Sequence, residues 1–310
     1  MTSKTTCTAI GAGLFLSTFT AIGGTTADNF APAPSAPAEL ALPEFDFLKF
    51  TATQTGGMDF KNEPGDLSLT QYSLTAFLSR PEALTDSLTM IPYFSYSLTQ
   101  LDFDNSAFPV GDEDFHSTSL SAIFVQDFAN SPWFGVAWTR AELATDFQAI
   151  GEEDVTFDLA LGVGYKVSDT LTVAAGFMAA NFNGDLQFYP GLNFMWAPCE
   201  DFSMALYGAN FFAKYEMNDN WYLSVNGEQG GGIWNINDAQ GNSRSVDLDS
   251  YWVSLSTHHR ITGELWFSAG LGYTFANEIE IRGNRGGGPS TSRELDGAPL
   301  AQISLSLHDW

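Results

Sequence analysis

Polar and ionisable residues recur on one face of segments that otherwise alternate between apolar and small side chains. By parity, the following residues share the face that carries glycine, alanine and serine: Asp158, Lys166, Tyr222, Asn226, Glu228 and His258. An ionisable side chain on the inner face of a barrel is tolerated when it is hydrated or paired. The set therefore predicts either the lining of a water-filled path or a group of paired charges that fills the interior.

A second set of acidic residues is concentrated in one predicted loop. Asp102, Asp104, Asp112, Glu113 and Asp114 occur there without a compensating lysine or arginine. A negative mouth would concentrate cations and repel anions. The alternative interpretation is a solvated loop that keeps the chain soluble during transit.

Arginines gather in another predicted loop, which is rich in glycine. Arg282, Arg285 and Arg293 lie within it or at its ends. The guanidinium group suits bidentate contacts with phosphate. We therefore expect this loop to contact lipid phosphates, or to form a constriction if it folds into the lumen.

Catalytic and metal-binding motifs are absent from the sequence. There is no GxSxG, HExxH, Walker A or dinucleotide GxGxxG motif, no EF-hand spacing and no CxxC pair. His258 and His259 fall at a predicted short turn, where a hydrolytic site near the outer rim could not use them. The prediction is a protein that is not an enzyme and has no cofactor and no metal site.

Charge and composition exclude further classes. The chain has 12 Lys+Arg against 37 Asp+Glu, a formal charge of −25, and nucleic-acid binding needs clustered cations. Charged residues make up 16% and aromatic residues 14%, whereas soluble domains average about 25% charged residues. This composition excludes a nucleic-acid partner and a disordered chain.

Apolar residues alternate with small or polar residues along the chain, as in residues 155–167 and 265–275, although Trp266 interrupts the second pattern. This period of two predicts strands, and the longest apolar run, residues 173–180, is too short for a membrane-spanning helix. A closed barrel with its apolar face in lipid accounts for the small residues on the other face. A soluble secreted β-sandwich stays the alternative, because alternation alone does not say which face is wet.

Junctions of two kinds interleave along the chain. The predicted short turns are 80–87, 129–132, 167–170, 197–201, 217–220 and 257–262. The predicted loops of the second set, mostly longer and more polar, are 58–66, 102–114, 146–154, 181–185, 235–245 and 282–296. Short turns at one rim and longer loops at the other are typical of outer-membrane barrels, and an even strand number keeps both termini at one rim. The prediction is about 14 strands, with a short hairpin near Gly208 as the least secure pair and 12 strands as the alternative.

Tryptophans near the short turns favour the same orientation. Trp133, Trp196, Trp221 and Trp266 each lie within a few residues of such a turn. Indole side chains concentrate at the level of the lipid headgroups. We expect these tryptophans to form an aromatic girdle.

The N-terminal region predicts export. Residues 1–27 carry one charge, Lys4, and then a short apolar stretch, which is typical of a signal peptide; a retained membrane anchor is the alternative. Residues 28–44 are rich in proline and alanine and predict a linker. The barrel is then expected over residues 45–310.

The last segment, residues 303–310, alternates and ends on Trp310, and it resembles the C-terminal assembly signal of bacterial outer-membrane barrels. From about Phe45 to Trp310 the chain resembles the uncharacterised porin-like outer-membrane β-barrel families of Gram-negative bacteria, and residues 197–273 carry the clearest likeness. The resemblance implies an all-β, transmembrane, antiparallel up-and-down barrel located in the outer membrane. Its expected partners are outer-membrane lipid and the barrel-assembly machinery, and an oligomer is compatible with the pattern.

These patterns lead to one expected function and one alternative. The expectation is a passive porin-like channel for small solutes, with a weak preference for cations. The alternative is a non-conducting structural or adhesion barrel that acts through its surface loops.

Overall fold

The computed structural model describes residues 31–32, 43–44, 46–104, 112–129, 131–147, 150–151, 154–182, 185–237, 243–283 and 290–308. This part of the chain forms strands, and it contains no helix long and apolar enough to cross a membrane. The predicted signal peptide lies outside it. Of the predicted linker it holds only β1 (Ala31–Pro32) and β2 (Pro43–Glu44), which pair with each other.

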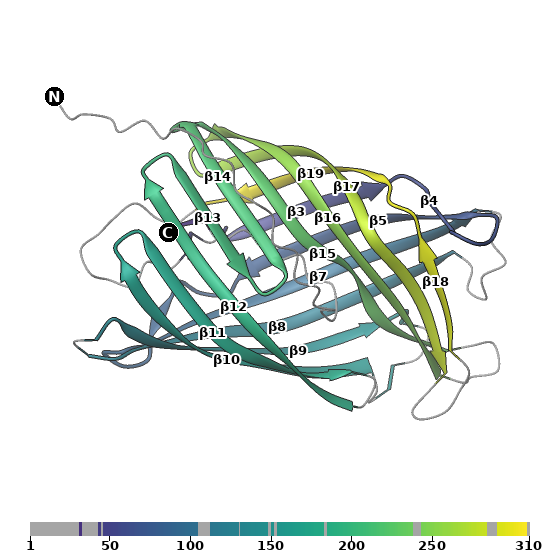
Figure 1. Ribbon diagram of the computed structural model, residues 1–310, viewed down its shortest axis with the longest axis horizontal. Coiled ribbons are helices and arrows are strands. Elements are labelled where there is room, and N and C mark those ends of the chain that lie inside the picture. Colours follow the sequence, from purple (N-terminus) through teal and green to yellow (C-terminus); the bar gives the residue numbers. More distant parts are fainter. Residues whose placement is uncertain are drawn as a thin grey trace.

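Fourteen antiparallel strands close into an up-and-down barrel (Figure 1). The first seven are β3 (Leu48–Thr55) with its continuation β4 (Met58–Asp59), β5 (Asp66–Phe77), β7 (Leu88–Asp104), β8 (Glu113–Asp127), β9 (Trp133–Thr145), β10 (Val155–Ser168) and β11 (Leu171–Phe182). The others are β12 (Asp185–Cys199), β13 (Phe202–Tyr207), β14 (Asn210–Asn218), β15 (Trp221–Asn237), β16 (Ser243–Thr262), β17 (Leu265–Gly283) and β18 (Thr291–Leu295), which continues into β19 (Pro299–Leu307). The fold class and strand number predicted from the sequence are confirmed.

The first and last strands pair and close the barrel. β19 runs antiparallel to β3, from Leu307 opposite Leu48 to Leu300 opposite Thr55. Both strands have their terminal ends at the rim where most turns are short, such as residues 200–201 and 263–264. We call this rim the turn end and the opposite rim the loop end. The turn between β5 and β7 is longer and contains the short strand β6 (Glu82–Ala83).

Alternation along each strand separates an apolar outer face from a polar inner face. Leu161, Phe267 and Leu305 point outward and are 40%, 37% and 46% exposed, whereas the inward Ser268 and Ser304 are 8% and 7% exposed. An apolar outer surface of this kind suits lipid, because apolar side chains need no hydrogen-bond partner there. The orientation of the two faces is the one expected from the sequence.

The wall is incomplete toward the loop end, because β13 and β14 form a short hairpin that turns at Gly208. β12 pairs with β13 only from Asn193 onward, and β14 pairs with β15 only as far as Gly227. Beyond this level β15 makes a parallel bridge to β9, in which Asn235 lies opposite Thr145. The loop-end part of β15 therefore joins a strand on the other side of β10, β11 and β12 (Figure 1).

Candidate functional site

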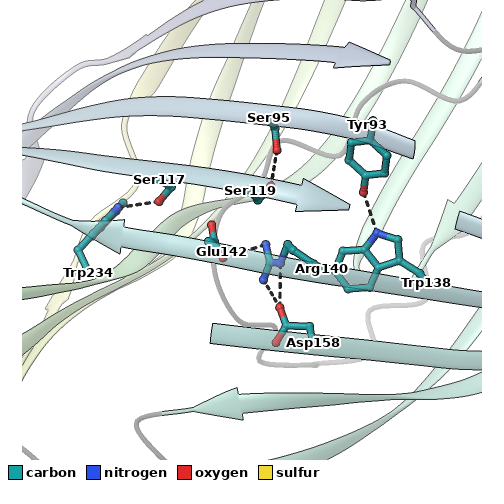
Figure 2. Close-up of polar contacts among 9 residues, drawn as sticks. All are labelled: Tyr93, Ser95, Ser117, Ser119, Trp138, Arg140, Glu142, Asp158 and Trp234. Atoms are coloured by element: carbon teal, nitrogen blue, oxygen red, sulfur yellow. Dashed lines mark hydrogen bonds and ion pairs between the residues drawn. The ribbon is translucent and has the colours of Figure 1, made fainter. Parts of the chain in front are cut away.

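The interior of the barrel holds a polar layer at mid-height. Its hydroxyl and amide side chains are each no more than 9% exposed; on β3, β5, β7 and β8 they are Thr51, Thr53, Gln71, Ser73, Thr75, Ser97, Thr99, Ser117, Ser119 and Ser121. Buried hydroxyl groups are stable when they find hydrogen-bond partners. One such pair joins adjacent strands, since Ser95 Oγ and Ser119 Oγ are 2.7 Å apart (Figure 2). Short polar side chains thus line the inside of this half of the wall.

A charged cluster lies within the polar layer. Arg140 donates from Nε and Nη2 to Asp158 Oδ2 at 2.8 and 2.5 Å, and its Nη1 lies 3.2 Å from Glu142 Oε2 (Figure 2). The three side chains are 2–7% exposed. Arg140 and Glu142 are two residues apart on β9, and Asp158 faces Arg140 across the β9–β10 ladder. One buried cation is thus shared by two carboxylates, an arrangement that depends on all three groups being present.

A small polar cavity of about 10 Å³ adjoins Glu142. Hydroxyl-bearing residues of β5, β7 and β8 line the rest of it: Ser73, Thr75, Ser95, Tyr96, Ser97, Ser117 and Ser119. This volume matches one water molecule. The polar layer therefore has room for a water molecule beside Glu142.

Aromatic side chains border the charged cluster on its turn-end side. Trp138 Nε1 donates to Tyr93 Oη at 2.7 Å, and the guanidinium carbon of Arg140 lies 5.4 Å from the centre of the Trp138 ring (Figure 2). These contacts fix the position of the arginine side chain from a second direction. The cluster is therefore held by its ion pairs and by the ring beneath it.

Four of the predicted lumen residues lie inside the opposite half of the barrel. Asn226 and Glu228 are 4% and 7% exposed on β15, where Asn226 Nδ2 donates to Ser224 Oγ at 3.1 Å and Glu228 Oε2 accepts from Trp252 Nε1 at 3.4 Å. Tyr222 and His258 form a stack, with ring centroids 4.0 Å apart. They are therefore interior residues, and their role in lining a water-filled path stays a prediction.

The turn end of the interior is narrowed by aromatic and histidine rings. Lys214 Nζ lies 4.7 Å from the centre of the Tyr222 ring, and the Trp266 ring lies 5.3 Å from Tyr222 and 5.0 Å from His308. His308 Nε2 is 2.6 Å from Asp46 Oδ1, which joins the residues just outside the two closing strands. Lys166 lies at the turn end of β10 and is half-buried, away from Asp158.

An apolar plug fills the interior at the loop end. We give this name to the following buried residues: Met58, Phe60, Leu67, Leu69, Leu101, Phe115, Ala144, Trp234, Ile236, Val246, Leu248, Ile279, Ile281, Leu295 and Ala298. They come from both sides of the barrel, and burying each large apolar side chain stabilises the fold by about 1.5–3 kcal/mol. The sequence analysis did not predict this plug, which closes the end where an open porin would have its mouth.

Trp234 carries the contact between the two sides of the plug. Its ring stacks on Phe115 of β8 with centroids 4.8 Å apart and an interplanar angle of 13°. Its Nε1 donates to Ser117 Oγ at 3.2 Å (Figure 2). β15 thus reaches across the mouth, and Trp234 contacts β8 through both its ring and its N–H group.

The strands that carry the plug change direction at one level. In β15 the change falls at Gly230, Gly231 and Gly232, where Gly231 has φ of +90° and a Cβ atom would lie 1.8 Å from the carbonyl oxygen of Leu248. In β17 it falls at Ala276, with φ of +52°. A β-bulge interrupts the β16–β17 ladder at the same level, and bulges bend the strand that contains them. These features form a line across three strands about which the loop-end part folds inward.

The predicted acidic mouth lies at the loop-end rim. Asp102 and Asp104 lie at the end of β7, Asp112 directly precedes β8, and Glu113 and Asp114 begin β8. Asp112 Oδ1 accepts from the amide of Phe103, and Asp114 Oδ1 accepts from Gln100. The rim is therefore strongly negative at this point.

The described arginines of the predicted basic loop form separate ion pairs. Arg282 lies 2.7 Å from Glu280 and 3.2 Å from Asp247, and Arg293 lies 2.7 Å from Glu63. Arg285 lies outside the described residues. The two described arginines therefore neutralise carboxylates of their own rim.

Three of the four tryptophans expected in an aromatic girdle lie at the outer surface, whereas the expectation for Trp266 was wrong. Trp133 and Trp196 are 50% and 39% exposed and Trp221 is half-buried, whereas Trp266 is 6% exposed. Trp266 shares the inward parity of Ser268, so its ring stacks inside the barrel. In the described part of the chain, no group of three or more His, Cys, Asp or Glu side chains could hold a metal ion.

Comparison with known proteins identifies one sequence family and several solved structures of similar barrels. A domain family of unknown function, DUF6268, matches residues 62–286, and a search of curated protein sequences gives no match. The structure of an outer-membrane channel from Pseudomonas putida F1 is similar at 12% identity, covering 89% of this chain and 99% of that one, with a TM-score of 0.48. The toluene transporter TodX of Pseudomonas putida is similar at 11% identity, covering 93% and 96% of the two chains, with a TM-score of 0.30. A FadL homologue from Pseudomonas aeruginosa has 8% identity, coverages of 84% and 88%, and a TM-score of 0.32.

Proposed function

The chain belongs to DUF6268, a family of unknown function, and from the barrel itself we propose that it is an outer-membrane channel for small polar solutes, closed at its loop end by a movable plug. The polar layer carries this proposal. It lies inside a closed barrel whose outer face is apolar, and polar interiors of this kind line the water-filled channels of porins. The plug is the gate of this channel.

The gate opens when the loop-end part of β15 moves. That part is held to the far wall by the contacts of Trp234 and by the bridge between Asn235 and Thr145. Three successive glycines lie directly before it, and glycine accepts the backbone changes that a hinge requires. Withdrawal of Trp234 from Phe115 would connect the polar layer with the loop-end rim.

A weak preference for cations follows from the charges along this path. The rim carries Asp102, Asp104, Asp112, Glu113 and Asp114. The polar layer carries Asp158, Glu142 and Glu228 against Arg140, with Lys214 at the turn end. A path with excess negative charge raises the local concentration of cations. The substrates are therefore small cations and neutral polar molecules, which cross without a covalent step.

Planar-bilayer recording tests this proposal. We expect infrequent openings of the wild-type protein, a reversal potential that favours cations, and more frequent openings of Trp234→Ala. The triple variant Asp112→Asn, Glu113→Gln, Asp114→Asn should shift the reversal potential toward anions. The matched control Asp169→Asn, Asp201→Asn, Asp219→Asn removes the same charge at the turn end and should shift it less.

The filled interior favours a second candidate, a non-conducting barrel that acts through its loops. The observation behind it is the burial of the plug, in which Trp234, Leu248 and Phe115 are at most 1% exposed. If this candidate is correct, planar bilayers should show no channel openings for the wild type or for Trp234→Ala. Closed bilayers in both cases would overturn the channel.

A further inference from the structure

Trp234 occupies its place in the plug as a bound aromatic molecule would. Its ring lies 4.8 Å from that of Phe115 at 13°, and its N–H donates to Ser117 Oγ. Binding sites for small molecules combine apolar and aromatic walls with a few polar groups that fix orientation. Stacking on Phe115 and donation to Ser117 therefore define a site that a side chain of the protein itself fills.

The strand that carries Trp234 can leave this site while its pairing with β14 stays intact. β14 pairs with β15 only as far as Gly227, and β16 accompanies β15 to its end at Asn237. Withdrawal of the side chain therefore breaks the bridge between Asn235 and Thr145 and moves the loop-end part of the β15–β16 pair together with the part of β17 that is paired with it. The pairing of β15 with β14 below it persists. Gly231, with its positive φ, lies between the two parts.

We propose that the space between Phe115 and Ser117 is a binding site for a small flat aromatic molecule that carries one hydrogen-bond donor, as indole does. Such a molecule competes with the Trp234 side chain for the Phe115 ring and for Ser117 Oγ. Its binding releases β15 and opens the plug. This inference rests on the proposed gated channel and names the ligand that operates its gate.

The proposed ligand needs a hydrogen-bond donor because Ser117 Oγ, which accepts from Trp234, lies beside the apolar plug, and Ser117 is only 7% exposed. A ligand without an N–H or O–H group would leave the Ser117 oxygen without the bond that Trp234 now gives it. We expect indene, the analogue of indole in which carbon replaces nitrogen, to bind about tenfold more weakly, which is about 1.4 kcal/mol. Saturated ring compounds lose the stacking contact as well.

Chemical rescue of Trp234→Ala tests the site without relying on conductance. Truncation empties a space of indole shape, and apolar cavities of this kind bind matching aromatic molecules. Indole should raise the thermal midpoint of this variant in detergent, and indene should raise it less. Adding Ser117→Ala to Trp234→Ala should abolish the preference for indole, whereas adding Ser203→Ala, a buried inward serine on β13, should preserve it.

A second variant covers the case in which Trp234→Ala does not fold. Trp234→Phe keeps a ring on Phe115 but has no N–H group, so indole should displace it more readily than it displaces tryptophan. The apparent affinity for indole, measured by titration, should then be about tenfold higher than for the wild type. Equal affinity in the two proteins would overturn the site.

Conductance separates the ligand site from the channel. The account expects indole to increase the openings of the wild type and to reduce those of Trp234→Ala, where it refills the empty space. Binding of indole with closed bilayers in both proteins would support the site and overturn the channel. Conduction by Trp234→Ala without an indole effect on its thermal midpoint would support the channel and overturn the site.

Discussion

The indole N–H of Trp234 donates to Ser117 Oγ at 3.2 Å, across 117 positions of the sequence and from one side of the barrel interior to the other. The same indole ring stacks on Phe115, which neighbours Ser117 on the inner face of β8. A contact between two non-adjacent strands inside a barrel closes the space between them.

The stack between Phe115 and Trp234 should be measurable as a coupling free energy in a double-mutant cycle. Phe115→Ala and Trp234→Ala should each lower the free energy of unfolding by about 3–5 kcal/mol. The double variant should cost less than the sum of the two by about 0.5–1.5 kcal/mol, because the stacked pair is lost only once. Urea unfolding in lipid vesicles gives these values. Phe77 lies in a separate apolar cluster, so Phe77→Ala combined with Trp234→Ala should be additive.

Gly231 should be intolerant of a side chain. Its φ is +90°, and a Cβ atom would lie 1.8 Å from the carbonyl oxygen of Leu248. We expect Gly231→Ala to lower the free energy of unfolding by about 1–3 kcal/mol and to expose the loop-end part of β15 to added protease. At Gly191 no atom lies within 4 Å of the Cβ position. Equal protease sensitivity of Gly231→Ala and Gly191→Ala would contradict the hinge.

Among substitutions in the charged cluster, loss of the cation Arg140 should lower the free energy of unfolding most. Arg140→Met leaves Asp158 and Glu142 buried without their shared partner, and breaking a buried ion pair costs about 3–5 kcal/mol. Asp158→Asn leaves Arg140 beside Glu142 and should cost less. Lys61→Met removes an exposed ion pair with Glu294 and should leave the unfolding curve unchanged. A loss for Arg140→Met as small as that for Lys61→Met would contradict the cluster.

The pairing of Asp46 with His308 should make the free energy of unfolding depend on pH in the acid range. Burial raises the pKa of Asp46, but the hydrogen bond and charge of His308, with the charges of Lys49 and His258, bring it below the ordinary value. The folded chain then binds fewer protons at Asp46 than the unfolded chain does. Its stabilisation is therefore complete above the ordinary pKa of about 3.9 and disappears as the pH falls through the lower folded value. The wild type should lose its stability advantage over Asp46→Asn in that interval, and parallel pH curves for the two proteins would argue against the pairing.

Much of the barrel could be predicted from the sequence because alternation and turn spacing are local signals. The parity of residues 155–167 assigned Asp158 to the inside, and the spacing of short turns gave the strand number, including the hairpin at Gly208. Arg140 and Glu142 were missed as its partners, although they alternate with Thr139 and Ala141. Their meeting with Asp158 depends on the β9–β10 register, which no local pattern shows.

The plug left a partial signal in the sequence. Leu67 and Leu69 have the same parity as the inward Gln71 and Ser73, so the inner face of β5 changes from polar to apolar toward the loop end. In β17 the signal misleads, because Ile279 has the same parity as the outward Tyr273 and yet is fully buried. The change of face follows from the β-bulge opposite β16 and from the positive φ of Ala276. Residues other than glycine rarely adopt a positive φ, so this conformation could not be predicted from an alanine.

A reversible tether across the mouth is the most direct test of the gate. Asn235 and Thr145 are paired across the β15–β9 bridge, so Thr145→Cys with Asn235→Cys, in a protein whose Cys7 and Cys199 are replaced by serine, allows a disulfide between the two sides. A control pair, Thr53→Cys with Gln302→Cys, joins β3 to β19 below the plug. In planar bilayers, the account predicts that oxidation of the first pair abolishes openings, that reduction restores them, and that oxidation of the control pair changes neither. Equal numbers of openings with the first pair oxidised and reduced would contradict a channel gated at Trp234.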